Sequence, residues 1–164
     1  MRELSNPSNL KIHCKGQTFQ IEDLLPGAFG ENRKEGHGLL DSTGTNLEPG
    51  KTKPETQAQL AINAAQLSYT PYSHAPEGFV AQCLDGHSFS GRAAESIAFN
   101  PSVSGVVVAL NQRNLSSRRS VAITACTQTK LATALNNPLA QAKAIMKHIA
   151  GASVDEVQME VSRL

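Results

Sequence analysis

The five histidines of this 164-residue chain are the residues most suited to bind a catalytic metal. Zinc sites combine such ligands with each other or with cysteine at short spacings, as in His-x-x-x-His or Cys-x-x-Cys. Neither spacing occurs here, so the histidine pattern does not predict a metal site. Strand edges are expected for His13 and His87, solvated loops for His37 and His74, and a helix end for His148.

One carboxylate and one basic cluster could also take part in chemistry. Glu95 could hold a sugar hydroxyl or, equally, form a surface salt bridge. Arg113, Arg118 and Arg119 are expected in a solvated loop. The sequence has no phosphate-binding loop, nucleophile elbow or dinucleotide-binding fingerprint, and it pairs no nucleophile with a base. A metal-free catalyst that combines Glu95 with a histidine is therefore not favoured.

The elements that must position these residues follow from hydrophobic periodicity. Two hairpins are predicted from short apolar runs around glycine turns, with strands at 10–14 and 18–21, and at 78–83 and 87–90. Two helices are predicted from apolar residues at helical spacing and from a proline in the first turn, over 54–67 and 138–150.

Two further strands and one ambiguous segment complete the pattern. Strands are predicted at 120–126 and 157–161, the second with one solvated face. Residues 103–111 are too continuously apolar for a one-sided strand and too few to be distinguished from a buried helix by pattern alone. Strands that alternate with helices favour a layered α/β fold over a sandwich or a bundle. Residues 31–53 are rich in Gly, Asn, Thr, Pro, Glu and Lys, which predicts a linker.

Composition limits the functions that the chain can have. Its 15 Lys and Arg residues balance 14 Asp and Glu residues, which argues against nucleic acid or an acidic membrane as the main partner. No apolar run approaches the roughly 20 residues of a membrane-spanning helix. No export signal is recognised at the start of the chain. The odd number of widely spaced cysteines predicts buried thiols in a reducing compartment, and hence a cytoplasmic protein: Cys14, Cys83 and Cys126.

Three motifs in a fixed order carry a family resemblance: Leu24-Leu25-Pro26-Gly27-Ala28-Phe29-Gly30, Pro71-Tyr72-Ser73, and Ala98-Phe99-Asn100-Pro101. Together they resemble the cytidine deaminase family, and most closely its homodimeric two-domain bacterial type. The resemblance places residues 1–30 at the end of a catalytic domain, 31–53 in a linker and 54–164 in a degenerate second copy of that domain. It implies a three-layer α/β/α fold with a mixed sheet, preceded by an N-terminal hairpin and linker, in which 103–111 is a buried helix.

The resemblance also implies that this chain lacks the residues that carry the family's zinc chemistry. In the family, one helix begins with a His or Cys two residues before a Glu, and another begins with Pro-Cys-x-x-Cys. These ligands leave zinc an open position for water, and the Glu transfers protons. The motifs align with Ser104-Gly105-Val106 and with Pro138-Leu139-Ala140-Gln141-Ala142. We therefore expect no catalytic residue, no metal site and no cofactor in this chain, with zinc confined to the catalytic domain of the parent enzyme.

The role implied by the resemblance is that of a partner domain. The parent enzyme would hydrolytically deaminate cytidine or deoxycytidine in pyrimidine salvage. In its homodimer, this chain would pack with the catalytic domain and complete the partner's nucleoside pocket through Phe29, Ala98 and Phe99. The alternative is a stand-alone nucleoside-binding or interaction module without catalysis. Ala75 and Ala93 weaken nucleoside binding, because they replace an aromatic residue and an Asn of the family's pocket.

Overall fold

The computed structural model describes residues 3–4, 6–27, 38–41, 44–45, 47–49, 56–98 and 102–161. Two compact units make up the chain, Met1–Thr43 (unit 1) and Gly44–Leu164 (unit 2). The segment expected to be a linker contributes the short strand β3 (Leu47–Pro49) to unit 2, and Leu47 is buried there.

Unit 1 contains the predicted N-terminal hairpin. Strands β1 (Lys11–Cys14) and β2 (Gln17–Gln20) pair antiparallel, and the short helices η1 (Pro7–Asn9) and α1 (Ile21–Leu24) flank them. Lys15 and Gly16 form the turn with φ of 49° and 78°, a left-handed pair typical of two-residue hairpin turns. The expectation that Cys14 is buried is wrong, because this two-stranded ribbon leaves most of its side chains exposed.

Unit 2 is built on a five-stranded sheet, which is mixed, as predicted. Its strands run in the order β3-β7-β6-β4-β5; β6 and β7 are parallel and the other neighbours are antiparallel. The remaining strands of the sheet are β4 (Gly78–Cys83), β5 (Ser88–Arg92), β6 (Ile123–Leu131) and β7 (Val154–Val161). The hairpin β4–β5 agrees with the predicted strands at 78–83 and 87–90.

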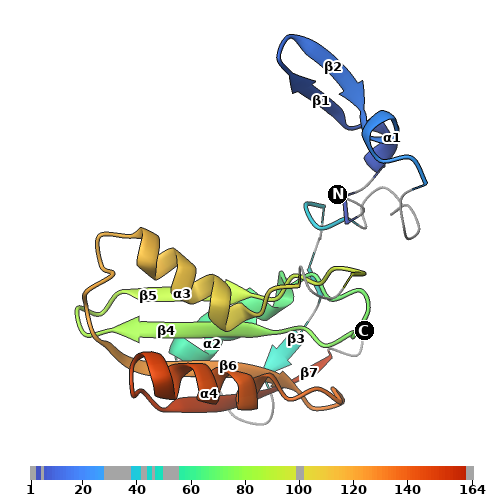
Figure 1. Ribbon diagram of the computed structural model, residues 1–164. Helices are drawn as coiled ribbons and strands as arrows, with labels where there is room; N and C mark the ends of the chain where they lie inside the picture. The colour runs from blue at the N-terminus through green and yellow to red at the C-terminus, as the bar shows by residue number, and fades with distance from the viewer. Residues whose placement is uncertain are drawn as a thin grey trace. The chain divides into compact units, whose positions relative to one another are not determined.

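Three helices cover the two faces of this sheet (Figure 1). One core cluster joins α3 (Gly105–Leu115) and α4 (Pro138–Ile149) to the face that carries Phe79, Ala81 and Cys83. A second cluster joins α2 (Thr56–Gln66) to Leu131 and Met159 on the other face. The predicted three-layer α/β/α fold is therefore confirmed, and 103–111 is mostly helical.

The helices begin and end at the residues that the sequence marks. Asn137 caps α4, with its side chain accepting a hydrogen bond from the Ala140 N–H, and Pro138 occupies the first turn. The last turn of α4 carries Lys147 and His148, where cations interact favourably with the helix dipole, as predicted for His148.

At 12 residues, α4 is the longest described helix, and no described helix is long and apolar enough to cross a bilayer.

Two glycines let the backbones of helices pack directly against the backbone of the sheet. A Cβ on Gly91 of β5 would lie 2.0 Å from the Gly105 carbonyl oxygen and 2.6 Å from the Ala109 nitrogen of α3. A Cβ on Gly78 of β4 would lie 2.0 Å from the Ala61 carbonyl oxygen of α2 on the opposite face. These positions fix where α2 and the first turns of α3 rest on the sheet.

Two strand boundaries differ from the sequence prediction. Strand β6 begins three residues after position 120 and continues to Leu131, through the polar run Thr127-Gln128-Thr129. These polar residues are buried in the sheet, and the side chains of Gln128 and Thr129 bind backbone atoms of Gly78 or Thr129. Strand β7 begins at Val154 rather than at 157, because it pairs in parallel with β6 from Cys126 onward.

Replacing Gly91 with Ala should destabilise the fold, because the new methyl group would overlap the backbone of α3. We expect the free energy of unfolding to fall by about 2–4 kcal/mol, measured by urea denaturation. Ser90→Ala, at an exposed position of the same strand, serves as the control and should change it by less than about 0.5 kcal/mol. Equal stability of the two variants would contradict the close approach of α3 and β5.

Candidate functional site

The candidate site lies at the N-terminus of α3, where the resemblance places the first zinc motif. Ser104 is the residue that precedes the helix, and Gly105 is its first residue. The first N–H groups of a helix have no partner within the helix, so they attract a negatively charged group. In this chain that group is the side chain of Glu77, a residue that the sequence prediction did not single out.

Glu77 joins three segments of unit 2. Its carboxylate oxygen Oε1 accepts a hydrogen bond of 2.8 Å from the Gly105 N–H. Its own N–H donates to the Ser68 hydroxyl at 3.3 Å, and its carbonyl accepts from the Ala93 N–H at 3.1 Å. Only 7% of the residue is exposed. The segment after α2, the end of β5 and the start of α3 therefore all meet at this residue.

The environment of Glu77 raises its pKa above the ordinary value of 4.5. Burial is the main cause, since it disfavours the charged form, and the negative charge of Glu95 acts in the same direction. The hydrogen bond from Gly105 lowers the pKa but does not reverse the shift. Glu77 is therefore a buried carboxyl. Its ionised form is stabilised by the N-terminus of α3 and disfavoured by burial and by the charge of Glu95.

Glu95 binds backbone groups, a role that neither alternative drawn from the sequence included. Its Oε2 atom accepts hydrogen bonds from the backbone N–H groups of Tyr72 and Ser73, at 3.0 and 3.1 Å. Its own N–H donates to the Tyr69 carbonyl. The carboxylate thus holds the Pro71-Tyr72-Ser73 turn against the end of β5, and this oxygen is already occupied by two donors.

The residues at the starts of α3 and α4 do not match the donors that zinc requires. Ser104 Oγ is buried and has no hydrogen-bond partner among the described residues. The first turn of α4 offers Pro138, Leu139 and Ala140, with Asn137 engaged as the cap. The described part of the chain brings together no three His, Cys, Asp or Glu residues that could hold a metal ion. The described residues at these helix ends therefore do not match the donor set with which the family holds zinc.

The structure describes only one of the three residues predicted to line a partner's pocket. Ala98 is exposed, in the turn that follows Glu95, and its N–H donates to the Ser96 hydroxyl at 3.4 Å. Phe29 and Phe99 lie outside the described residues. Ala75 and Ala93, at positions where the family carries pocket residues, are both buried.

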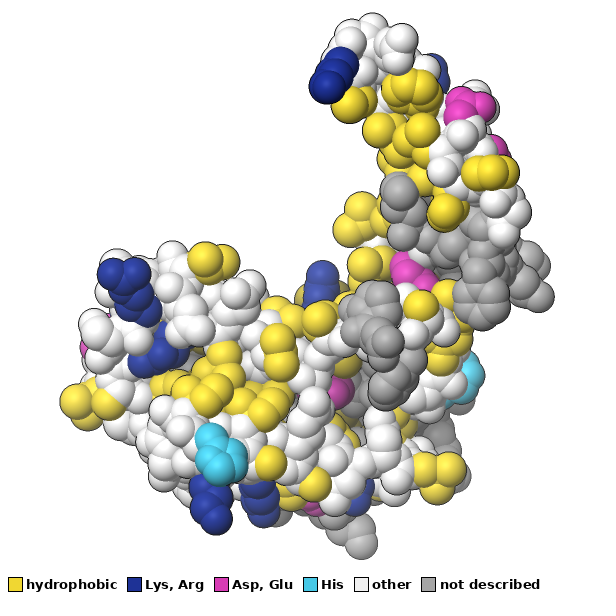
Figure 2. Space-filling model, in the orientation of Figure 1, with side chains coloured by type: hydrophobic (Ala, Val, Ile, Leu, Met, Phe, Trp, Pro, Cys, Tyr) yellow, Lys and Arg dark blue, Asp and Glu magenta, His cyan; other side chains and the backbone are white. Residues whose placement is uncertain are grey.

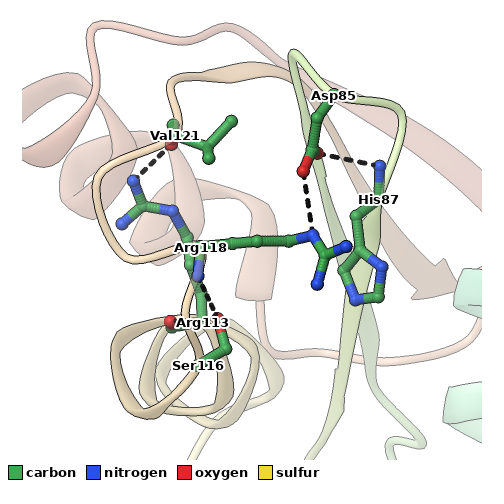
Figure 3. Close-up of polar contacts among 6 residues, drawn as sticks. All are labelled: Asp85, His87, Arg113, Ser116, Arg118 and Val121. Carbon is green, nitrogen blue, oxygen red and sulfur yellow. Dashed lines mark hydrogen bonds and ion pairs between the residues drawn. The ribbon is translucent and has the colours of Figure 1, made fainter.

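The basic cluster lies at the other end of β4 and is more structured than a solvated loop (Figure 3). Arg118 forms an ion pair of 2.8 Å with Asp85, whose other oxygen accepts from the His87 N–H. Arg113 belongs to α3 and donates to the Val121 carbonyl. Arg119 is exposed, as expected. The cluster ties the β4–β5 turn to the loop after α3, and it does not belong to the candidate site.

The remaining predicted histidines and cysteines do not join the site. His13 of β1 and His87 before β5 are exposed, as is His74, and His37 lies outside the described residues. Cys83 and Cys126 are buried in the core, as predicted. Burial raises the pKa of the Cys126 thiol to about 12, so it is a neutral core residue rather than a reactive thiolate.

Comparison with known proteins identifies the class to which this fold and site belong. A family model described as the cytidine and deoxycytidylate deaminase zinc-binding region matches residues 18–146. Cytidine deaminases from Salmonella paratyphi B and Salmonella newport are each 39% identical to this chain over 117 residues, which cover 70% of this chain and 39% of theirs. The solved cytidine deaminase from Burkholderia pseudomallei is 16% identical, with a TM-score of 0.55 over 65% of this chain and 86% of that chain.

The fold is thus the cytidine deaminase fold, for which the Burkholderia structure is the evidence. The chain belongs to the cytidine and deoxycytidylate deaminase family. It spans only 39% of the length of the curated relatives that it matches.

Replacing Glu77 with Gln should alter how stability depends on pH. Because the pKa of Glu77 is raised in the folded state, its contribution to the free energy of unfolding is largest below 4.5 and is lost as the pH rises through the raised value. Gln cannot ionise, so the variant does not lose this stability as the pH rises. Urea denaturation should therefore show that Glu77→Gln gains stability relative to the wild type between pH 4.5 and neutral pH. Glu22→Gln, an exposed carboxylate of α1, is the control, and matching profiles for Glu77→Gln and the wild type would refute the assignment.

The two helix starts should respond differently to alanine. Ser104 Oγ has no hydrogen-bond partner in the part of the chain that the structure describes, so Ser104→Ala should leave the free energy of unfolding within about 0.5 kcal/mol of the wild type or raise it. Asn137 caps α4, so Asn137→Ala should lower it by about 1 kcal/mol. Thermal and urea denaturation of both variants check this contrast. A larger loss at Ser104 than at Asn137 would show that the Ser104 hydroxyl has a partner in solution.

Proposed function

We propose that this chain is the non-catalytic half of a zinc-dependent cytidine deaminase and that it serves assembly of the enzyme dimer. The observation that carries the proposal is the hydrogen bond that the Glu77 carboxyl accepts from the Gly105 N–H. In the family that the chain resembles, this helix start carries a metal ligand and the catalytic Glu, whereas here it carries Ser104, Gly105 and Val106. The first N–H of this helix is bound instead by a side chain of the domain itself, which supports the proposal.

The length of the match supports the same proposal. The curated relatives are named cytidine deaminases, and the chain accounts for 39% of their length. The remaining part of such a protein would supply the zinc ligands and the acid–base Glu that this chain lacks. Deamination of cytidine or deoxycytidine would then belong to the assembled enzyme, and this chain would contribute Phe29, Ala98 and Phe99 to the nucleoside pocket of the partner subunit.

Nucleoside binding by the chain alone is the weaker candidate. Glu95 Oε2 already accepts from two backbone N–H groups, which leaves Oε1 as the oxygen that a sugar hydroxyl could reach. Ala75 and Ala93 supply neither a stacking ring nor an amide. A cytidine titration of the purified chain, followed by calorimetry, should therefore give no binding heat.

The purified chain should neither retain zinc nor deaminate cytidine. We expect zinc well below one equivalent per chain by elemental analysis after dialysis, and no loss of cytidine absorbance above the buffer rate. The Salmonella cytidine deaminase, purified and assayed in parallel, provides the positive control. Stoichiometric zinc together with turnover by this chain alone would refute the proposed function.

A further inference from the structure

The two edges of the five-stranded sheet differ in how well they are protected against further pairing. Strand β3 forms one edge; it has three residues and ends in Pro49, which has no N–H to donate. Short strands, prolines and charges are the usual means by which natural sheets keep a further strand from adding to an edge. Strand β5 forms the other edge (Figure 1); it contains no proline, and only its last residue, Arg92, is charged.

Hydrogen bonds at the two ends of β5 show how its backbone is oriented. The Cys83 N–H donates to the His87 carbonyl at 2.8 Å, and the Ala93 N–H donates to the Glu77 carbonyl at 3.1 Å. In an antiparallel pair, hydrogen-bonded positions alternate with positions whose N–H and C=O groups point to the other side. Because the register between β4 and β5 has no shift, the odd-numbered residues from His87 to Ala93 are the ones that bond to β4.

The even-numbered residues of β5 therefore present their N–H and C=O groups on the outer side of the sheet. No described residue pairs with these groups; Ser90 and Arg92 are exposed, and Ser88 is half-buried. The next even-numbered residue, Ala94, does have a partner, since it exchanges two hydrogen bonds of 2.9 Å with Val103. Among the described residues, the edge is thus open from Ser88 to Arg92 and is paired immediately beyond.

An open strand edge defines its partner more closely than an apolar surface does. Figure 2 shows hydrophobic side chains over the α3 and α4 layer, but such side chains can contact surfaces of many shapes. Outward N–H and C=O groups at the spacing of a strand can all be satisfied together only by another extended chain. The partner of β5 must therefore supply a strand.

We propose that β5 pairs antiparallel with the β5 of a second copy of this chain, around a two-fold axis at Ser90. In this register Ser90 lies opposite its own counterpart, and Ser88 lies opposite Arg92 of the partner subunit. Each of these pairs exchanges two backbone hydrogen bonds, so every outward group of the open segment obtains a partner. The inference deepens the proposed function, on which it rests for the role of the pairing, by naming the strand that joins two copies.

The residues of the edge are compatible with this two-fold register. Ser90 brings no charge to the axis, and Arg92 faces a serine rather than another cation, so no like charges oppose each other. Pairing of β5 with β3 of another copy is a poorer fit, because β3 is shorter and Pro49 cannot donate. Such a head-to-tail contact would also extend into an open chain of copies instead of closing as a dimer.

Sedimentation of the full 164-residue chain over a range of concentrations tests the proposal. A short strand pair is a small interface, so we expect a reversible dimer with a Kd of the order of 10–100 µM. Ser90→Pro should raise this Kd at least about tenfold, because it removes the central outward N–H of both copies and spares the bonds to β4. Ser90→Ala keeps all backbone groups and should leave the Kd within about twofold of the wild-type value.

Charged residues at Ser90 test the two-fold axis itself. Ser90→Glu and Ser90→Lys should each raise the Kd at least about tenfold, because each variant places a like charge opposite its own copy. An equimolar mixture of the two should form a heterodimer, detected by native mass spectrometry, because the facing charges are then opposite. Gln59→Glu and Gln59→Lys, at an exposed position of α2, are the matched controls and should each dimerise as the wild type does.

Several results would overturn the β5 pairing. They are a wild-type chain that stays monomeric at about 500 µM, a dimer that tolerates Ser90→Pro, and a Glu and Lys mixture that forms no heterodimer. Circular dichroism identifies any variant that fails to fold, and the charged variants keep the test valid if Ser90→Pro does. A monomer that holds no zinc and deaminates nothing would overturn only the pairing. Turnover with stoichiometric zinc would instead refute the proposed function, and the Ser90 variants would still decide the pairing.

Discussion

The hydrogen bond between the Glu77 carboxyl and the Gly105 N–H is the interaction on which the structure of the site depends. It satisfies a backbone donor that the helix itself cannot satisfy, in a place from which water is largely excluded. The same residue also binds Ser68 and Ala93 through its backbone. One side chain and its peptide groups therefore hold α3 against the ends of two other segments.

The close approach of α3 to the sheet is the condition for this contact. Gly91 and Gly105 both lack a side chain, and a Cβ on Gly105 would meet the Gly91 carbonyl oxygen at 2.9 Å and Glu77 Oε1 at 3.3 Å. Small residues thus bring the helix start close enough to the strand for the carboxyl to reach it. The family model that matches this chain is named for a zinc-binding region, and in this chain the start of α3 carries the buried Ser104 hydroxyl and the Glu77 carboxyl.

The sequence was sufficient to predict the elements whose local signals agree with their packing. The hairpin turns at Gly16 and Gly86 adopt the left-handed φ that glycine favours, and Asn137 with Pro138 marks the start of α4. Strand β6 was predicted too short, because Thr127, Gln128 and Thr129 look like loop residues until partners elsewhere in the sheet are known. The pattern also gave no prediction of β3, since a three-residue strand is specified by its pairing with β7.

The site was harder to predict than the fold. The resemblance located the two helix starts, but it could not identify which group binds the first N–H of α3, because that depends on a contact between residues 28 positions apart. One signal was present: Glu77 alternates with Phe79, Ala81 and Cys83, and therefore points to the face of β4 that α3 and α4 cover. A carboxylate at such a position needs a partner. The sequence indicated Glu95 because its carboxylate could bind a sugar hydroxyl or form a salt bridge. The partners that the structure shows are backbone N–H groups, which only the folded chain brings near it.

Hydrogen exchange of the Gly105 amide, followed by NMR with a chelator and then with excess zinc, tests the central claim most directly. If the Glu77 carboxyl is the partner of this amide, its protection should be strong in the presence of chelator and should not change when zinc is added. Protection that is absent with chelator and restored by zinc would show that a metal organises this helix start, and would contradict the account.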